Sequence, residues 1–281
     1  MLKLLLVEGN TVQARMLHAE AGGAIAHKLY AETLLGIRGE LSFAVAFPAD
    51  DGVVLPRAPD IKAYDGIVWT GSALNIYQGG PAVERQIHFA RDCFHAGVPQ
   101  FGSCWGLQVA VAASGGEVIL NPKGREIGIA RKIVQTAQGR SHPLYHKKPA
   151  VFDALAVHKD TVARLPRGAE VLAANDNSEF QAASFFFDNG PFWGVQYHPE
   201  YTFGEVAACM TRYAANLVDE TLFETEAEAV AIAREFASFD QGASKAARWR
   251  YGLDETVLDT AERRRELSNW LGYIHEKQLL S

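Results

Sequence analysis

The sequence predicts an α/β protein with a doubly wound, mostly parallel β-sheet that is flanked by helices. Through the first half of the chain, short apolar runs bounded by Gly, Pro, Asp or Asn alternate with stretches of helical spacing, which is the pattern of such a sheet. Residues that carry chemistry follow directly after two of these runs, and doubly wound sheets place their sites at the carboxyl ends of strands. A length of 281 residues is enough for one large α/β domain and an extension, or for two small domains.

The first half is expected to supply the parallel strands and two of the flanking helices. Residues 2–7 are almost uniformly apolar, as in a strand that is buried on both faces. Further strands are expected at residues 43–47, 66–70 and 98–101, and helices at residues 24–35 and 81–96. Residues 10–23 run into Ala-Gly-Gly-Ala at positions 21–24 and are expected to form a loop, either near the pocket or on the plain surface.

From about residue 116 to residue 195 the pattern changes to short β-like runs. They are separated by turns such as Asn-Asp-Asn at residues 175–177 and Asp-Asn-Gly at residues 188–190. The runs are residues 118–120, 127–135, 169–174 and 182–187. The chain is then expected to return to the sheet at residues 192–197 and to continue as a helix over about residues 204–218.

The remainder of the chain is predicted to be a helical extension. We expect a catalytic domain over residues 1–222 and an extension over residues 223–281, with helices at residues 227–239 and 255–276 and Asp254 as an N-cap. Apolar residues recur at helical spacing in the last helix: Val257, Leu258, Ala261, Leu267, Trp270, Leu271 and Ile274. This stripe is expected to pack on the domain or on a second copy of the chain, with recognition of a separate partner as the alternative.

Composition limits the class of protein. Hydrophobic residues make up 48% and charged residues 21%, which is ordinary for a globular protein, and the net charge of −6 argues against a nucleic-acid surface. The apolar run at residues 2–7 is too short for a signal peptide, and no run of about 18 apolar residues predicts a membrane span. Three cysteines cannot form a disulfide framework, so a reduced, cytoplasmic setting is expected. No Cys-x-x-Cys or His-Glu-x-x-His motif occurs, and neither a metal nor another cofactor is expected.

A lone thiol between two glycines is the main chemical signal. Residues 101–106 read Phe-Gly-Ser-Cys-Trp-Gly, between an apolar run and a helical stretch that starts near Leu107. A strand, a tight turn with the nucleophile at its tip and a helix make up the nucleophile elbow, here with sulfur in place of oxygen. Glycines suit this turn because the backbone is strained and neighbouring Cβ atoms would clash. Taken alone, the motif fits a buried cysteine in a turn equally well.

A histidine and a carboxylate follow much later, at the end of another apolar run. Residues 194–200 read Gly-Val-Gln-Tyr-His-Pro-Glu, which places His198 two residues before Glu200. On its own such a pair is more often structural than catalytic. Together with Cys104 it predicts a nucleophile, its base and the group that orients the base. Their separation along the chain is no obstacle, because such residues assemble in space.

With these residues, the chain resembles the class I glutamine amidotransferases, which hydrolyse the side-chain amide of glutamine through a cysteine thioester. The resemblance covers roughly residues 1–220 and implies a flavodoxin-like sheet. Within the family, the chain is similar to the glutaminase domain of GMP synthase. Three blocks carry it: residues 101–108, residues 194–200, and Asp-Gly-Ile-Val-Trp-Thr-Gly-Ser at residues 65–72. The family usually has a Gly-Gly pair or a proline-containing variant in the last of these loops, where this chain reads Thr-Gly-Ser-Ala at residues 70–73.

The resemblance implies catalytic roles for five residues. Cys104 would be the nucleophile, His198 the base and Glu200 its partner. Gly71 and Trp105 would donate backbone N–H groups to the oxyanion. Many members have glycine immediately before the nucleophile, where this chain has serine.

Substrate-binding residues are also implied by the resemblance. Gln108 would line the glutamine pocket, beside Ser72 of the upstream loop. His158 and Asp160 belong to a Val-His-Lys-Asp segment that resembles the family's Ser-His-Gly-Asp, with Lys159 in place of the glycine. Because that segment lies near the acceptor side of the pocket, Lys159 bears on the choice of substrate.

Three functions remain open. The preferred one is a glutaminase-type hydrolase that releases glutamate and ammonia for a separate acceptor enzyme, since the chain has no Walker A sequence or pyrophosphatase loop of its own. The alternative is a self-contained hydrolase of another γ-glutamyl amide or peptide. The third is a non-catalytic binding or regulatory protein, against which the full set of three catalytic residues argues.

The partners expected differ between the first two functions. Glutamine or a γ-glutamyl small molecule is the expected ligand, and neither nucleic acid nor membrane is expected. A second copy of the chain and a separate synthase subunit are left open as protein partners. A partner-dependent glutaminase should leave an exposed apolar docking surface. A self-contained hydrolase should instead cover its pocket with its own chain.

Overall fold

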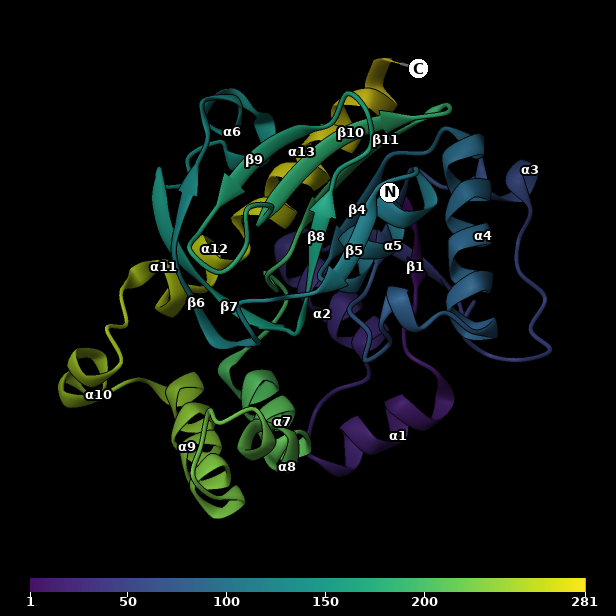
Figure 1. The fold of residues 1–281 in the computed structure, drawn as a ribbon. Coiled ribbons are helices and arrows are strands. Elements are labelled where there is room, and N and C mark those ends of the chain that lie inside the picture. Colours follow the sequence, from purple (N-terminus) through teal and green to yellow (C-terminus); the bar gives the residue numbers. More distant parts are fainter. Residues whose placement is uncertain (281) are drawn as a thin grey trace.

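The centre of the protein is a nine-stranded β-sheet, shown in Figure 1 for a computed structural model that describes residues 1–280. The strands lie in the order β2-β1-β3-β4-β11-β10-β9-β6-β7. Their bounds are β1 (Leu2–Val7), β2 (Leu41–Ala46), β3 (Gly66–Trp69), β4 (Gln100–Ser103), β6 (Glu126–Gln135), β7 (Val151–His158), β9 (Glu170–Ala174), β10 (Ala182–Phe187) and β11 (Gly190–Val195). A separate antiparallel pair consists of β5 (Glu117–Leu120) and β8 (Asp160–Arg164).

The sheet is parallel from β2 to β11 and antiparallel from β11 to β7. The predicted α/β fold is therefore confirmed, with its parallel part formed by the first four strands of the chain and β11. Strand β1 shows the physical reason: Leu4 and Leu6 pack in the hydrophobic cluster of one face, and Leu5 and Val7 pack in that of the other. A strand covered on both faces needs apolar residues at successive positions.

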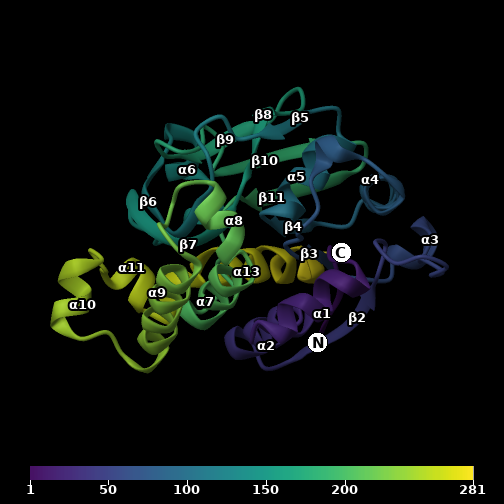
Figure 2. The same ribbon diagram turned by 60° about the horizontal axis from the view of Figure 1, so that its bottom comes forward.

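Helices cover both faces of the sheet. The helices α4 (Pro81–Ala96) and α5 (Trp105–Ala113) pack on one face. The helices α2 (Ala26–Ile37) and α13 (Arg265–Leu280) pack on the other, and Figure 2 shows both in one layer. The other helices and helical turns are α1 (Val12–Glu20), α3 (Ala58–Ile61), η1 (Ile76–Gln78), α6 (Ala137–Ser141), η2 (Pro143–Tyr145), α7 (Phe203–Arg212), α8 (Ala214–Asp219), α9 (Glu226–Ser238), η3 (Phe239–Gln241), α10 (Lys245–Arg250), α11 (Glu255–Leu258) and α12 (Thr260–Arg263).

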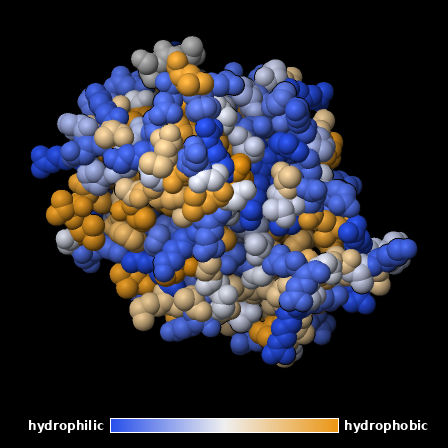
Figure 3. Space-filling view, turned by 180° about the vertical axis from the view of Figure 1, so that it is seen from behind, coloured by the Kyte–Doolittle hydropathy of each residue, from blue (hydrophilic) through white to orange (hydrophobic). Residues whose placement is uncertain are grey.

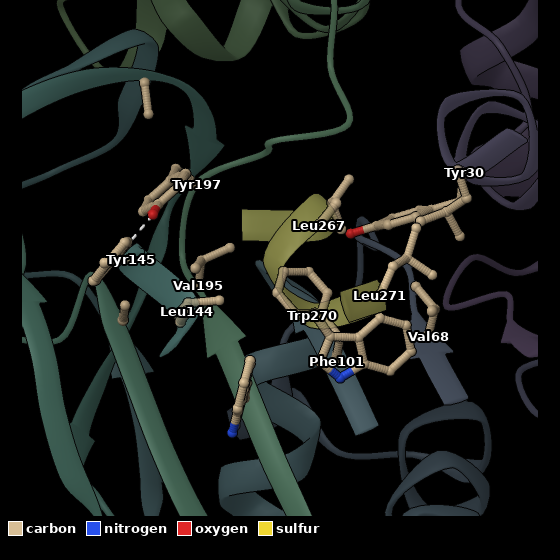
Figure 4. Close-up of a cluster of buried hydrophobic side chains, with 14 of the residues drawn as sticks. Tyr30, Val68, Phe101, Leu144, Tyr145, Val195, Tyr197, Leu267, Trp270 and Leu271 are labelled. Atoms are coloured by element: carbon tan, nitrogen blue, oxygen red, sulfur yellow. Dashed lines mark hydrogen bonds between the residues drawn. The ribbon is translucent and has the colours of Figure 1, made fainter. Parts of the chain in front are cut away.

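The C-terminal helix α13 packs directly on the parallel strands. Trp270 is fully buried, and its ring centroid lies 5.9 Å from that of Phe101 on β4 (Figure 4). A Cβ at Gly66 would lie 2.7 Å from the Trp270 ring, so the first residue of β3 must be glycine for the tryptophan to fit. Leu267, Leu271 and other residues of the predicted apolar stripe belong to the same cluster.

A buried ion pair ties α13 to the strand that leads into the predicted site. The Lys148 ammonium lies 3.0 Å from a carboxylate oxygen of Glu266, and both side chains are almost completely buried. Tyr197, directly after β11, donates to Glu266 at 2.6 Å, and its hydroxyl lies 2.9 Å from that of Tyr145. Because a buried carboxylate needs compensating partners, these contacts fix the position of α13 relative to β11.

The helices after residue 223 share a hydrophobic cluster with α7 and β7. Phe236 and Phe239 contact Phe203 of α7, with ring centroids 6.0 and 5.5 Å away. Val257 and Leu253 belong to this cluster too. The division into a domain over residues 1–222 and an extension over residues 223–281 stays a prediction.

The prediction of a loop over residues 10–23 is wrong, because most of this segment forms α1. The side chain of Thr11 caps the helix by accepting from the Ala14 N–H at 3.3 Å. Ala14 is the one buried residue of α1, and the apolar Met16 is 59% exposed. A helix that buries so little has no apolar periodicity for a sequence pattern to detect.

Two other stretches differ from the prediction. Residues 204–218 form two helices, α7 and α8, which meet at Tyr213. Strands β7 and β8 are additional elements, which the sequence pattern did not predict because charged residues interrupt the apolar run over residues 151–164.

The helix predicted for residues 255–276 is divided into α11, α12 and the first part of α13. Asp254 caps α11 as predicted. Asp259 then ends that helix, and its carboxylate accepts from the N–H groups of Ala261 and Glu262 at 2.7 and 3.0 Å to start α12. A side chain that caps a new helix competes with continuation of the old one.

Within residues 1–280, no helix combines the length and apolar character needed to cross a membrane. Over the same residues, no group of three or more His, Cys, Asp or Glu side chains is arranged to hold a metal ion.

Replacing Glu266 with leucine is expected to lower the free energy of unfolding by about 3–5 kcal/mol, because the Lys148 ammonium would stay buried without its carboxylate. Urea denaturation measures this change. The control is Glu255→Leu, which removes an exposed ion pair with Arg248 and should cost less than about 1 kcal/mol. Equal effects of the two substitutions would contradict the role assigned to the buried pair.

Candidate active site

Cys104 lies in the turn between β4 and α5, at the carboxyl end of the parallel strands. Its backbone has φ 51° and ψ −104°, a conformation that residues with a Cβ rarely adopt. The Cys104 N–H donates to the Val195 carbonyl at the end of β11 at 2.8 Å, and its own carbonyl accepts from the Gln108 N–H at 3.1 Å. These bonds hold the strained turn between the sheet and the first turn of α5.

The two glycines of the motif are required by close backbone contacts. A Cβ at Gly102 would lie 2.6 Å from the backbone carbon of Gly106. A Cβ at Gly106 would lie 2.7 Å from the Cβ of Trp69 on β3. Helix α5 therefore approaches β3 and β4 more closely than any larger residue would permit, which is the reason for the predicted spacing of Gly, Cys and Gly.

His198 and Glu200 follow β11 and lie beside Cys104. The Nδ1 atom of His198 is 2.7 Å from Oε1 of Glu200, and both side chains are 2% exposed. The His198 ring lies beside the Cys104 side chain, whose sulfur donates to the Val157 carbonyl at 3.6 Å, and it stacks on Tyr201 with ring centroids 3.8 Å apart. With Nδ1 facing the carboxylate, Nε2 is the nitrogen left for the sulfur.

Two hydroxyl groups, those of Ser103 and Tyr30, form a hydrogen-bonded series that ends at Glu200. Ser103 donates to Oε1 of Glu200 at 2.9 Å, and the Tyr30 hydroxyl lies 2.5 Å from the Ser103 oxygen. Since the Ser103 proton is directed at the carboxylate, Tyr30 is the donor in its contact with Ser103. The chain from α2 through β4 to Glu200 fixes the carboxylate that faces His198.

The charges around His198 favour its protonated form. Burial opposes the charged ring, but the negative charge of Glu200 and the hydrogen bonds with Cys104 and Glu200 outweigh it and raise the pKa of His198 from 6.5 to about 10. His198 is therefore a cation over the neutral pH range, in direct contact with the sulfur.

The loop after β3 lies against the histidine. A Cβ at Gly71 would be 2.9 Å from Cε1 of His198, so only glycine fits there. The Asn10 side chain, three residues after the end of β1, holds this loop in place: its Nδ2 donates to the Gly71 carbonyl at 3.3 Å, and its Oδ1 accepts from the Ala73 N–H at 3.0 Å. Within residues 1–280, the backbone N–H groups of Gly71 and Trp105 have no acceptor.

Two cavities meet at Cys104. The larger, about 220 Å³, has a charged wall that includes Arg125, Lys159 and Asp160. The smaller, about 50 Å³, is lined by α1, by the start of α2 and by α7. Both share Cys104, Val157 and part of the loop after β3.

The larger cavity carries both signs of charge. Arg125 forms two bonds with the Glu220 carboxylate, at 2.7 and 3.0 Å, and the Lys159 ammonium lies 2.8 Å from the same group. These hydrogen bonds, that from Arg125 foremost, lower the pKa of Glu220 to about 2. Two cations thus share one carboxylate, which leaves one positive charge uncompensated.

Asp160 supplies the negative side of the larger cavity. It accepts from Nδ2 of Asn75 at 2.6 Å and from the Tyr77 hydroxyl at 3.0 Å. Burial raises the pKa of Asp160, and these hydrogen bonds offset the effect only in part. No cation of residues 1–280 forms an ion pair with it.

The other predicted substrate-binding residues also line the larger cavity. Nε2 of Gln108 donates to Gln196 at 3.2 Å, and Ser72 donates to the Gly9 carbonyl at 2.8 Å. His158 has both ring nitrogens engaged, Nδ1 with the Asp160 carbonyl at 3.0 Å and Nε2 with a Glu126 oxygen at 2.8 Å. Ser72 and His158 therefore hold the cavity wall, and their binding of substrate stays a prediction.

Several residues of the site were outside the sequence motifs. Asn10 could have been found, because it lies three residues after the end of the first strand, as the predicted site loops follow theirs. Tyr30 lies in the interior of a helix, and Arg125 lies just before β6. Arg212, the last residue of α7, lines the smaller cavity. Nothing local in the sequence distinguishes these three from ordinary core or surface residues.

The chain matches the family model of class-I glutamine amidotransferases over residues 50–213. A γ-glutamyl-L-1-hydroxyisopropylamide hydrolase from a Pseudomonas species is 34% identical over 277 residues, which is 97% of this chain and 93% of that protein. The chain belongs to the class I glutamine amidotransferase family. It is an amide-hydrolysing enzyme, as the sequence motifs predict.

Other amidotransferases are similar over part of the chain or in fold. A glutamine-hydrolysing GMP synthase subunit from Methanocaldococcus jannaschii is 33% identical over 125 residues, 44% of this enzyme and 63% of that protein. The structure of a glutamine amidotransferase from Thermotoga maritima matches with a TM-score of 0.60 at 18% identity and covers 100% of this chain and 99% of that one. One from Methylobacillus flagellatus matches with a TM-score of 0.62 at 20% identity, covering 97% and 95%. These structures share the enzyme's fold.

The His198 ring of the free enzyme is expected to titrate near pH 10, far above its ordinary 6.5. Glu200→Gln should shift this titration downward, because it removes the charge that raises the pKa and leaves the burial that lowers it. NMR titration of the histidine side chains measures both values. A wild-type His198 that titrates near its ordinary value would contradict the assignment.

The raised pKa of His198 also makes the stability of the fold depend on pH. Because the pKa of His198 is higher in the folded than in the unfolded enzyme, the charged ring stabilises the fold fully below about pH 6.5. This contribution is lost as pH rises through about 10. Urea denaturation at pH values between about 6.5 and 10 should show a smaller loss of unfolding free energy with rising pH in Glu200→Gln than in the wild type.

Proposed function

We propose that the enzyme hydrolyses γ-glutamyl amides to glutamate and a small amine, with glutamine as the smallest substrate of this class. The observation that carries the proposal is the position of Cys104 between two cavities of unequal size and charge. A γ-glutamyl amide has a zwitterionic glutamyl half and an amine half, on either side of the carbon that is attacked. The larger, charged cavity suits the first half, and the smaller one suits the second.

In this proposal Cys104 is the nucleophile. Its thiolate bonds to the amide carbon, and the carbonyl electron pair moves to the oxygen. The tetrahedral intermediate then collapses and the C–N bond breaks, while the His198 imidazolium gives its proton to the departing nitrogen. Water next adds to the thioester and gives a proton to His198, the C–S bond breaks, and glutamate leaves. Glu200 keeps the ring oriented and stabilises its charged form.

The oxyanion of each intermediate would be met by backbone N–H groups. Those of Gly71 and Trp105 are unoccupied within the described chain; Trp105 follows Cys104 directly, and Gly71 lines the same cavity as Cys104. Donors that are fixed before the reaction contribute about 3 kcal/mol each to lowering the barrier. The Asn10 clamp on the Gly71 loop supports this role because it holds one donor in place.

The glutamyl half would be recognised through its two charges. Its α-carboxylate complements the uncompensated positive charge of Arg125 and Lys159, and its α-ammonium complements Asp160. An ion pair with the ammonium would also offset the burial of the Asp160 carboxylate. Lys159, which replaces the glycine usual in the family, therefore adds to recognition of the acyl group in this proposal.

A self-contained hydrolase is supported over a subunit that passes ammonia to a partner. The walls of the smaller cavity come from the chain itself, with α1 and the start of α2 on one side and α7 on the other. On the face drawn in Figure 3, hydrophobic residues lie in separate groups among hydrophilic ones. The relative matched over 97% of this chain is named as a γ-glutamyl-L-1-hydroxyisopropylamide hydrolase, and that name agrees with hydrolysis of a γ-glutamyl amide.

The glutaminase function is the second candidate. It is supported by the GMP synthase subunit to which nearly half of the chain is similar. A synthase partner, a homodimer and a cytoplasmic location all remain predictions from the sequence. Rapid hydrolysis of glutamine only in the presence of an added synthase would favour this candidate.

Cys104→Ala should abolish the release of glutamate from γ-glutamyl amides, with a loss of about 10⁴-fold or more in kcat. His198→Ala should lose nearly as much, whereas Glu200→Gln should lose less because the nucleophile and base remain. The measurement is glutamate release from glutamine and from a panel of γ-glutamyl amides. Undiminished activity of Cys104→Ala would rule out the mechanism. Slow turnover of glutamine and no turnover of the larger γ-glutamyl amides would favour the second candidate.

Asp160→Asn should raise KM for γ-glutamyl amides by about 10- to 100-fold, because a hydrogen bond to a charged group contributes about 1.5–3 kcal/mol. The asparagine keeps the size of the side chain and the contact with the Tyr77 hydroxyl. The matched control is the Nα-acetylated form of the same substrate, which has no ammonium. Wild type should discriminate strongly against the acetylated form, and the variant should not; equal discrimination by both would show that Asp160 does not bind the ammonium.

A further inference from the structure

We propose that the smaller cavity selects a leaving amine that carries a carboxylate, which Arg212 binds. The preferred substrates would then be γ-glutamyl derivatives of small amino acids, linked through the γ-carboxyl group. This inference rests on the proposed function and adds the charge of the amine half. The amine half proposed here is charged, whereas that of the hydroxyisopropylamide named for the Pseudomonas relative is neutral.

One face of α7 supplies the polar wall of this cavity. Glu205, Cys209 and Arg212 are spaced four and three residues apart, which places their side chains in one row along the helix. All three line the smaller cavity, across from His18 of α1. The row therefore presents one acidic and one basic group to whatever occupies the space beside the sulfur.

The acidic group of this row is already hydrogen-bonded within the protein. Oε2 of Glu205 lies 3.0 Å from Nε2 of His18, and Oε1 accepts from the Ala24 N–H at 2.9 Å. Both oxygens of the carboxylate thus have partners. The His18 ring in turn lies against Gly23, where a Cβ would be 2.2 Å from the ring, so the pair is held in a fixed position.

Arg212 has no such partner. In the part of the chain that the structure describes, its guanidinium forms no ion pair and no hydrogen bond, and its contact is with the Tyr213 ring, 5.2 Å from the ring centroid. The half-buried guanidinium carries five N–H donors, which match the two oxygens of a carboxylate. Arg212 is therefore the charged side chain of this wall whose hydrogen-bond donors are left open, and they favour an anionic ligand group.

The size of the cavity limits the amine. A water-sized group takes about 10–15 Å³ of such space. The smaller cavity, at about 50 Å³, therefore holds a group of only a few non-hydrogen atoms. Glycine and alanine are near this limit. The inferred substrates are γ-glutamylglycine and γ-glutamyl-L-alanine.

The test compares two substrates that differ in one group. In γ-glutamyl-L-alanine and γ-glutamyl-L-1-hydroxyisopropylamide the amine halves share one carbon skeleton, with a carboxylate in the first and a hydroxymethyl group in the second. Wild type should show a higher kcat/KM for the carboxylate substrate, by about 10-fold or more, as expected for a charged hydrogen bond. Arg212→Gln should remove this preference by slowing the carboxylate substrate alone, and Arg212→Lys should retain part of it.

Arg234, an exposed arginine on α9, provides the matched control. Arg234→Gln should leave both rates unchanged. Binding of γ-glutamyl-L-alanine to Cys104→Ala and to the Cys104→Ala, Arg212→Gln double variant, measured by calorimetry, separates recognition from turnover. Weaker binding by the double variant is the expected result.

Two results would overturn the inference without touching the proposed function. One is a wild-type enzyme that hydrolyses the neutral substrate as fast as the carboxylate substrate or faster. The other is a preference that survives in Arg212→Gln. Failure of the proposed function looks different, since neither substrate nor glutamine would then be hydrolysed in a Cys104-dependent way, and the inference would fall with it.

Discussion

The close approach of α5 to strands β3 and β4 is the constraint on which the site depends. Gly102 and Gly106 leave no room for a Cβ, with clashes of 2.6 and 2.7 Å against neighbouring backbone and Trp69. Only at this separation does the chain reverse within one residue, which forces Cys104 into its positive φ. The position of the sulfur is therefore set by packing of the backbone, which shifts far less easily than a side-chain rotamer.

Buried polar groups from both halves of the chain then converge on this turn. Tyr30 of α2 reaches Glu200 through Ser103, and Glu200 faces His198. The serine stands where many members of the family have glycine, so this chain uses the position to add a donor to the carboxylate. A buried carboxylate is costly unless it is fully hydrogen-bonded, and each added donor reduces the cost.

The C-terminal helices support the site indirectly. Glu266 on α13 accepts from Tyr197, the residue that immediately precedes His198, and is itself paired with Lys148. Two buried carboxylates thus bind successive residues of this segment, Glu266 at Tyr197 and Glu200 at His198. This arrangement gives the last part of the chain a structural link to the chemistry.

Much of the fold follows from local patterns, and the exceptions have physical causes. The strand at residues 2–7 and the helix at residues 81–96 agree with the prediction, because burial on one or both faces imposes a regular apolar spacing. Helix α1 escaped prediction because it buries only Ala14. The helix expected at residues 255–276 is divided because Asp259 caps a new helix, a choice between two local hydrogen-bonding patterns that tertiary contacts decide.

The sequence by itself determined the α/β class, the family and the residues of the two motifs. Cys104, His198 and Glu200 follow apolar runs that a local sequence pattern identifies as strands. Only the tertiary structure decided which charges surround the sulfur. Arg125 and Arg212 are ordinary residues in their own segments, and they become significant because folding brings one into the larger cavity and the other into the smaller. The physical reason is that a charge acquires its role from the partners it has or lacks after burial, and those partners come from distant parts of the chain.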